Sequence, residues 1–348
     1  MRVAMLSGQN GPLRPDDWLK AAGTVADVIA IASVPALSLP PVPGLAHVGR
    51  DPELPHRYEV ATAPWPSWLP WATVSRIAAL LRFEAVECGR VDVLHAHAPG
   101  AEGLLPWLAR ACGIPYVVTD GAAAHGRLAR RLHGGAAAVL AVGEWHPVDA
   151  GTLPPVPARI RIGQDPVRVA VDGGACAGGE WELLAGAFAQ ARAKDARLRL
   201  HVVGGPSLPE ALDAPGAGRW VSHTPGRARG ALLHDLAHAD LFVTASHDQA
   251  SGLTALDALC SGTPVVGPAA GPLPALLRPG GGILVPPADQ RALAFALVRA
   301  AKLLPGHRPA ALAERTRRRF GLDAVGARLA AVYAEASAPA SESGSGRA

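Results

Sequence analysis

Short apolar runs alternate with stretches of helical periodicity along almost the whole chain. In the first half the apolar runs are RVAMLS, DVIAIAS, VDVLHAH, IPYVVTD and AAAVLAVG, and helical stretches such as GLLPWLARACG lie between them. A strand without alternating polar residues is typical of a parallel sheet that helices cover on both faces. The pattern therefore predicts an α/β, doubly wound domain over residues 1–160.

The same alternation begins again after the proline-rich segment TLPPVPARIRI. The expected strands of this half include VRVAVDGG, LRLHVVGG, ADLFVTAS, TPVVGP and GGILVPP. They predict a second doubly wound domain over residues 161–320, with the linker between Pro154 and Gln164. A final amphipathic helix over 321–336 is expected near the domain junction, and the small polar residues 337–348 are expected to form a disordered tail.

Two such domains joined by a short linker predict a fold in which both face a central cleft. Ligands of doubly wound sheets bind beyond the carboxyl ends of the strands, so loops of both domains should line that cleft. A chain of 348 residues, 49% of them hydrophobic, is long enough to bury one core in each domain.

The charge of the chain is only mildly basic, with a formal net charge of +4. No run of lysine and arginine is dense enough to predict nucleic-acid binding. The nearest candidate, Arg127–His133, fits either a solvated helix face or a patch that attracts an anionic membrane surface or a phosphorylated ligand.

The four cysteines lie far apart and never form a C-x-x-C pair. This spacing favours a reducing compartment, without a disulfide framework or a zinc site. The first residues, MRVAMLSGQNG, predict a strand and a turn rather than a signal peptide, and no apolar window reaches about 18 residues. We expect a cytoplasmic protein, with peripheral contact to the inner face of a membrane left open.

The stretch SHDQASGLTALDALCSGTPVVG, Ser246–Gly267, carries the most specific chemistry. It predicts a strand end, a turn of small residues over Ala250–Thr254, a helix and another strand. Small residues allow a ligand to approach the backbone, and the N–H groups at the start of the helix favour an anion such as a diphosphate. Asp257, about one turn further on, could accept hydrogen bonds from ribose hydroxyls. An ordinary helix with an acid near its positive end explains the same residues.

This stretch resembles the signature of the family 4 glycosyltransferases, E-G-F-G-L-x-x-x-E-A-x-A-x-G-x-P-V-V. The residues QASGLTALDALCSGTPVV follow it with Gly252, Leu253, Gly262 and Pro264 in register. The flanking segments ADLFVTAS and GGILVPPADQRALAFAL, the linker IRIGQDPVRV and the terminal RRRFGLDAVGARLAAVY are also similar to that family. The resemblance implies the GT-B fold, a nucleotide-sugar donor and sugar transfer with retention and without a metal.

The resemblance also implies a role for several residues of the second domain. Asp257 takes the position of the acid that contacts the donor ribose, and Gln249 takes the position of the acid near the donor sugar. The backbone of Gly252, Leu253 and Thr254 is implied to hold the distal phosphate. The donor site is implied to include Ser251 and Gly204 as well.

The chain departs from the family pattern where an arginine and a lysine usually hold the diphosphate. Gly174 and Gly179 occupy those positions. Two cations that face a leaving diphosphate stabilise the charge that develops in the transition state. We predict that Arg227 or Arg229, in the neighbouring segment TPGRARG, replaces them.

In the first domain, His97 ends the predicted strand VDVLHAH, and the resemblance makes it a candidate for the catalytic cleft. A histidine in that place is also common as a structural residue. Asp120 stands near the position where the family commonly has a second histidine, and it could orient the acceptor or the donor sugar. Gly8 and Gly11 fit a first glycine loop near the ligand, or an ordinary turn.

The sequence thus predicts a glycosyltransferase that transfers a sugar from a nucleotide sugar to a hydroxyl acceptor, which would be a glycan, a lipid or a small metabolite. No metal is expected because the chain has no D-x-D motif. The uncharged segment GGACAGG and the missing second histidine favour an alternative, a related protein that binds or scaffolds without turnover. An epimerase of the same fold would need an acid pair, and the sequence shows no convincing one.

Overall fold

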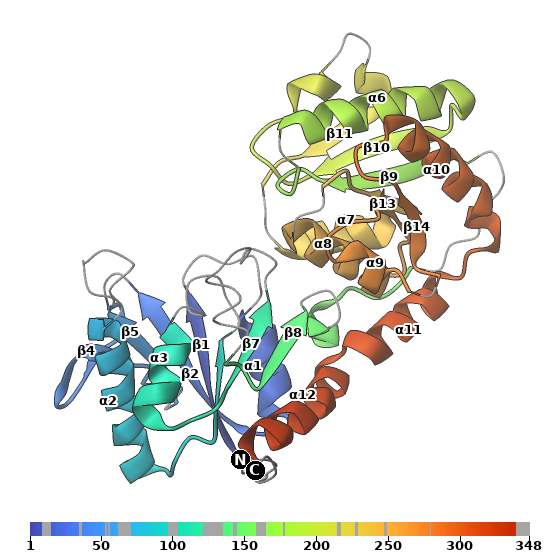
Figure 1. The fold of residues 1–348 in the computed structure, drawn as a ribbon. Coiled ribbons are helices and arrows are strands. Elements are labelled where there is room, and N and C mark those ends of the chain that lie inside the picture. Colours follow the sequence, from blue (N-terminus) through green and yellow to red (C-terminus); the bar gives the residue numbers. More distant parts are fainter. Residues whose placement is uncertain are drawn as a thin grey trace, which may run out of the picture. The chain divides into compact units, whose positions relative to one another are not determined.

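The computed structural model divides the chain into two compact units. Unit 1 comprises Met1–Pro147 and Leu322–Ala348, and unit 2 comprises Val148–Gly321. The structure describes residues 1–8, 15–34, 37–52, 54, 56–61, 71–96, 104–120, 135–141, 145–157, 165–176, 178–213, 217–226, 229–246, 249–278 and 280–338. Each unit contains its own sheet, and each is described by itself (Figure 1).

Unit 1 is built on an eight-stranded sheet in the order β3-β4-β5-β2-β1-β6-β7-β8. The strands are β1 (Arg2–Gly8), β2 (Asp27–Val34), β3 (Pro41–Val42), β4 (Leu45–Arg50), β5 (Arg57–Ala61), β6 (Val93–Ala96), β7 (Tyr116–Asp120) and β8 (Ala138–Ala141). All neighbours are parallel except β3–β4 and β4–β5. The antiparallel edge differs from the predicted parallel pattern, because the short turn at Gly44, where φ is +81°, folds the chain directly back.

Helices cover both faces of this sheet. The helices α2 (Trp71–Glu87) and α3 (Leu105–Cys112) pack on one face, where Leu6, Ile31 and Val60 are buried. The helices α1 (Pro15–Gly23) and α12 (Leu322–Ser337) pack on the other, around Trp18 and Tyr333. The last helix of the chain is therefore part of the core of unit 1.

Unit 2 contains a six-stranded sheet in the order β11-β10-β9-β12-β13-β14, and all its strands are parallel. The strands are β9 (Val167–Asp172), β10 (Leu198–Val203), β11 (Val221–Thr224), β12 (Leu241–Val243), β13 (Val265–Pro268) and β14 (Gly282–Val285). The longer helices are α6 (Gly178–Lys194), α7 (Arg229–His238), α8 (Gln249–Cys260), α10 (Gln290–Leu303) and α11 (Pro309–Phe320), and α9 (Leu273–Leu276) is one turn.

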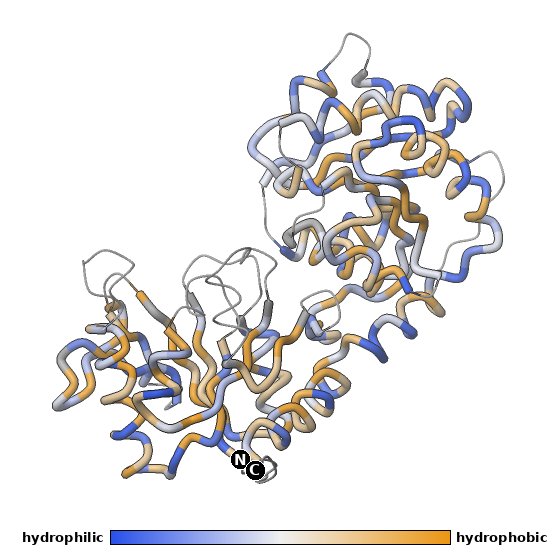
Figure 2. Tube along the Cα trace, in the orientation of Figure 1, coloured by the Kyte–Doolittle hydropathy of each residue, from blue (hydrophilic) through white to orange (hydrophobic). Residues whose placement is uncertain are grey.

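The helices of unit 2 also form two layers. On one face α6 and α10 bury Val169, Leu200 and Val243 of the sheet. On the other face α7, α8 and α11 pack with Ala170 and Phe242. In Figure 2 the strands are predominantly hydrophobic, whereas hydrophilic and hydrophobic residues alternate along the helices, which is the pattern expected of a sheet between two helical layers.

The division between the units falls between Pro147 and Val148, earlier than the expected position near residue 160. The backbone N–H of Val148 donates to the carbonyl oxygen of Phe320 at 2.7 Å, and Val148 also pairs with Gly321. The segment after Pro147 is thereby tied to the end of α11. The helix α12 continues to Ser337, the first residue of the expected disordered tail. Most of that tail, residues 339–348, lies outside the described residues.

We predict that Gly326→Ala destabilises the protein by about 1–3 kcal/mol. A Cβ atom at Gly326 would lie 2.6 Å from the carbonyl oxygen of Ala21 and 2.1 Å from Thr24 Oγ1, so α12 would have to move away from α1. Gly23→Ala is the matched control, because a Cβ there meets no atom within 4 Å. Urea unfolding of both variants measures the difference, and equal stability of the two would contradict this packing.

Candidate active site

The strand order of unit 2 reverses direction between β9 and β12. From β9 the chain proceeds outward to β10 and β11, and it then returns to the other side of β9 as β12. The carboxyl ends of the two central strands diverge at such a point and leave a crevice that commonly binds a ligand. Asp172 ends β9, and the segment after β12 leads into α8.

A buried hydrogen bond joins β9 to α8 at this point. Thr254 Oγ1 donates to Asp172 Oδ2 at 2.7 Å, and the backbone N–H of Gly174 donates to Asp172 Oδ1 at 2.8 Å. Both Asp172 and Thr254 are buried. Thr254 was predicted to lie at a phosphate, whereas Asp172 was not predicted, although an acid at the end of the apolar strand VRVAVD is a recognisable signal.

The structure brings Asp257 together with Arg229, two residues that the sequence analysis assigned separately to the donor. Asp257 lies in α8 and is 0% exposed, and Arg229 begins α7. Arg229 Nη2 lies 3.6 Å from Asp257 Oδ1, and the side chain of Arg229 is 35% exposed. A buried carboxylate needs such a partner because isolation in a protein interior strongly disfavours its charge.

The expected turn over Ala250–Thr254 is wrong, because α8 already begins at Gln249. Gly252 therefore lies in the first turn of the helix. A Cβ atom there would come within 2.2 Å of Pro272 Cγ, so glycine allows close packing against the segment before α9. Leu253 is buried beside it.

Close backbone contact also shapes the ends of β9 and β10. Gly204 follows β10 with φ +79°, a left-handed conformation that favours glycine. A Cβ atom at Gly173 would lie 2.4 Å from the carbonyl oxygen of Gly204. The two loops therefore meet without side chains between them, which leaves backbone at the carboxyl edge of the sheet.

The first N–H groups of a helix have no partner within that helix, so the start of α8 is electropositive. Arg229 adds a positive charge that is paired with the carboxylate of Asp257. Gly179 lies in the first turn of α6, where a Cβ atom would meet nothing within 4 Å.

Several predicted site residues lie outside the described part of the chain. His97, Gly11 and Arg227 are among them. Gln249 and Ser251 are described as helical and Asp120 as the end of β7, without their side chains. Gly8 is the last residue of β1, at the carboxyl edge of the sheet of unit 1.

The other histidine of the VDVLHAH segment, His95, has a structural environment. It is 0% exposed in β6, and its ring nitrogens lie 2.7 Å from the hydroxyl of Tyr333 and 2.8 Å from Thr119 Oγ1. Burial raises the pKa of Tyr333, so its hydroxyl stays protonated. His95 thus ties β6 to β7 and α12.

One group in unit 1 has the spacing of a metal site, although the sequence predicted none. Ligand atoms of His56, Glu84 and Cys88 lie within 4.8 Å of one another. The carboxylate of Glu84 is, however, already satisfied by Arg2 Nη2 at 3.0 Å and by the hydroxyl of Tyr58. Burial and this carboxylate raise the pKa of Tyr58. The group is therefore explained as a compensated buried charge.

Comparison with known proteins identifies the family. Residues 179–302 match the family model described as glycosyl transferases group 1. The chain is also 31% identical over 332 residues to a D-inositol 3-phosphate glycosyltransferase from Thermobispora bispora, an alignment that covers 77% of the chain and 76% of the relative. The chain belongs to the group 1 glycosyltransferases. A relative of the same description from Actinosynnema mirum is 36% identical over 152 residues, 40% of this chain and 36% of its own.

Solved structures confirm the predicted GT-B fold of this glycosyltransferase. Anabaena HepE, solved in complex with UDP, superposes with a TM-score of 0.68 at 16% identity, over 96% of this chain and 100% of its own. Sucrose-phosphate synthase from Thermosynechococcus elongatus superposes with a TM-score of 0.65 at 17% identity, over 96% and 98%. None of the described helices combines the length and hydropathy of a membrane-spanning segment.

We predict that Thr254→Val lowers the free energy of unfolding by about 1–3 kcal/mol, because it removes the buried donor to Asp172 while keeping the volume of the side chain. Thr254→Ser keeps the hydroxyl and is the matched control, with an expected loss of less than about 1 kcal/mol. Denaturant unfolding followed by circular dichroism measures both, and an equal loss in the two variants would show that the hydrogen bond is unimportant.

Proposed function

We propose that this glycosyltransferase transfers a sugar from a nucleotide-sugar donor to a hydroxyl acceptor, with retention and without a metal. The observation that carries the proposal is the ion pair between Asp257, in the third turn of α8, and Arg229, the first residue of α7, in the unit whose strand order reverses between β9 and β12. The resemblance to the family 4 enzymes assigns the ribose to the acid of this helix.

Each group would have a distinct role in donor binding. Asp257 would accept hydrogen bonds from the ribose hydroxyls, and Arg229 would orient this carboxylate and add positive charge near the diphosphate. The start of α8, from Gln249, would hold the distal phosphate with its backbone N–H groups. Gln249 would contact the donor sugar through its amide, and Asp120 and His97 would serve the acceptor from unit 1.

The relatives suggest which substrates to test first. Those from Thermobispora bispora and Actinosynnema mirum are described as D-inositol 3-phosphate glycosyltransferases, and Anabaena HepE was solved with UDP. We therefore propose UDP as the first nucleotide and a small phosphorylated polyol as the first acceptor class. The anomeric configuration of the product, read by NMR, tests retention, and turnover in the presence of EDTA tests metal independence.

One feature favours a second function: Gly174 and Gly179 stand at the two positions where the family 4 pattern has an arginine and a lysine. Gly174 donates its backbone N–H to Asp172, and Gly179 has no side chain to offer. A protein that binds a nucleotide sugar without turnover would fit these residues. Release of UDP from a UDP-sugar in the presence of acceptor separates the two functions.

We predict that UDP stabilises the wild-type protein and that Asp257→Asn removes most of this shift. A ligand at a hundred times its Kd adds about 2.7 kcal/mol to the free energy of unfolding. Because Arg229 contacts Asp257, the loss of UDP affinity in the double variant Arg229→Gln, Asp257→Asn should be smaller than the sum of the losses in the two single variants. Asp213→Asn, which removes an exposed acid of the same unit, is the control. Equal UDP shifts in wild type and Asp257→Asn would refute the assigned role.

We predict that Gly179→Lys tightens UDP binding about tenfold, since a new charge-assisted hydrogen bond is worth about 1.5 kcal/mol or more. The open space at Gly179 accepts a side chain, and lysine has a higher helix propensity than glycine. Gly179→Gln adds a side chain without the charge and should leave the affinity unchanged. Isothermal titration with UDP compares the three proteins, and the same gain in both variants would speak against a diphosphate at this position.

A further inference from the structure

One half of the sheet of unit 2 has an unusually polar face. Strands β10 and β11 belong to a parallel sheet, which helices normally cover on both sides. In β10, Leu198, Leu200 and Val202 are buried toward α6, while Arg199 and His201 alternate with them and are only partly buried. The helices α7 and α8 cover the central strands on that second face, so the outer strands remain open to solvent.

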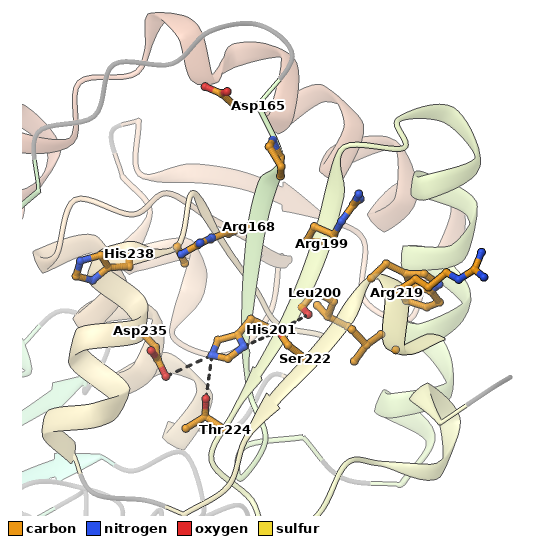
Figure 3. A pocket seen from close by; sticks show the side chains of 15 residues that line it. Asp165, Arg168, Arg199, Leu200, His201, Arg219, Ser222, Thr224, Asp235 and His238 are labelled. Carbon is orange, nitrogen blue, oxygen red and sulfur yellow. Dashed lines mark hydrogen bonds and ion pairs between the residues drawn. The ribbon is translucent and has the colours of Figure 1, made fainter. Parts of the chain in front are cut away.

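A hollow of about 710 Å³ lies over this polar face. It is bounded by α7 and by the short turn Ala217–Arg219, and the strands β9, β10 and β11 form its floor (Figure 3). Its volume lies in the range of pockets that hold small organic ligands. Arg168 and Arg199 stand near the amino ends of their strands, so the hollow is separate from the crevice at the carboxyl ends.

The hollow carries more positive than negative charge. Arg168, Arg199 and Arg219 line it together with two acids, Asp165 and Asp235, and within the described part of the chain no carboxylate forms an ion pair with any of the three arginines. Arg199 Nη1 donates to the carbonyl oxygen of Ala196 at 2.6 Å, which orients the guanidinium without neutralising it.

The floor of the hollow is a connected hydrogen-bond network. His201 lies 2.8 Å from Ser222 Oγ through Nδ1, and 3.3 Å from both Asp235 Oδ2 and Thr224 Oγ1 through Nε2 (Figure 3). The acid Asp235 is thus engaged with the histidine. Both hydroxyl groups of the network belong to β11, beside His201 of β10, and they can bind the oxygens of a ligand.

From these observations we propose that the hollow binds a ligand that bears a phosphate group, at a site separate from the donor crevice. Guanidinium groups match the geometry and charge of phosphate oxygens, and the serine and threonine hydroxyls supply further donors. The phosphate can belong to a soluble metabolite or to a lipid headgroup. The site follows from unit 2 alone and does not depend on the proposed transfer reaction.

The test compares wild type with the double variant Arg168→Gln, Arg199→Gln. Isothermal titration with inorganic pyrophosphate and with glycerol phosphate, at saturating UDP, tests a soluble ligand. Cosedimentation with phosphatidylglycerol vesicles, against phosphatidylcholine vesicles, tests a headgroup. We expect the double variant to bind one of these probes at least about tenfold more weakly, since each lost charge-assisted hydrogen bond is worth about a factor of ten.

Two further variants make the result specific. Arg291→Gln, Arg299→Gln removes the same charge from exposed positions of α10 and should bind as wild type does. Arg168→Lys, Arg199→Lys keeps the charge and should recover part of the binding. Weaker binding of the soluble probes by the double variant indicates that the ligand is a metabolite. Weaker binding of the anionic vesicles alone indicates that it is a lipid headgroup. The proposal is wrong if the double variant binds every probe as wild type does, or if the α10 variant loses as much.

Discussion

The hydrogen bond from Thr254 to Asp172 is the constraint on which the candidate active site depends. It is buried and joins the end of the central strand β9 to the second turn of α8. Through it the helix that carries Asp257 is fixed to the strand at which the sheet reverses its order. This link joins α8 to the loop after β9, because Asp172 also accepts the backbone N–H of Gly174.

Buried charge is handled in the same way in both units. Two deeply buried carboxylates have a nearby cation: Arg229 for Asp257 in unit 2, and Arg2 for Glu84 in unit 1. The desolvation of each carboxylate is offset only because its partner is held in place by the surrounding elements. The two pairs differ in surroundings, since Tyr58 also binds Glu84, whereas Asp257 lies beside the predicted donor crevice.

The sheet of unit 2 has two edges with different chemistry. At the carboxyl edge, glycine backbones approach closely, as Gly173 and Gly204 do, and the start of α8 supplies N–H groups. Near the amino edge, side chains such as Arg199 and His201 occupy a face that helices leave open. The proposed donor site would use backbone groups of the first edge, and the proposed phosphate site would use side chains of the second.

Local sequence patterns determined much of this protein. The apolar runs correctly predicted the parallel strands and both doubly wound units, because burial on two faces leaves a local record in the sequence. The signature around Gly252 and Asp257 correctly indicated a glycosyltransferase and the helix α8, although it placed the start of that helix several residues too late. The resemblance extended over the flanking strands as well, which is why it indicated the GT-B fold.

Only the tertiary structure decided which distant residues meet. Periodicity does not specify that Arg229 contacts Asp257, that Thr254 binds Asp172, or that α12 packs on α1. The start of α8 at Gln249 was missed because glycine normally disfavours a helix, and here its packing against another segment outweighs that preference. Each of these outcomes depends on contacts between segments far apart in the chain, and the local sequence carries no record of such contacts.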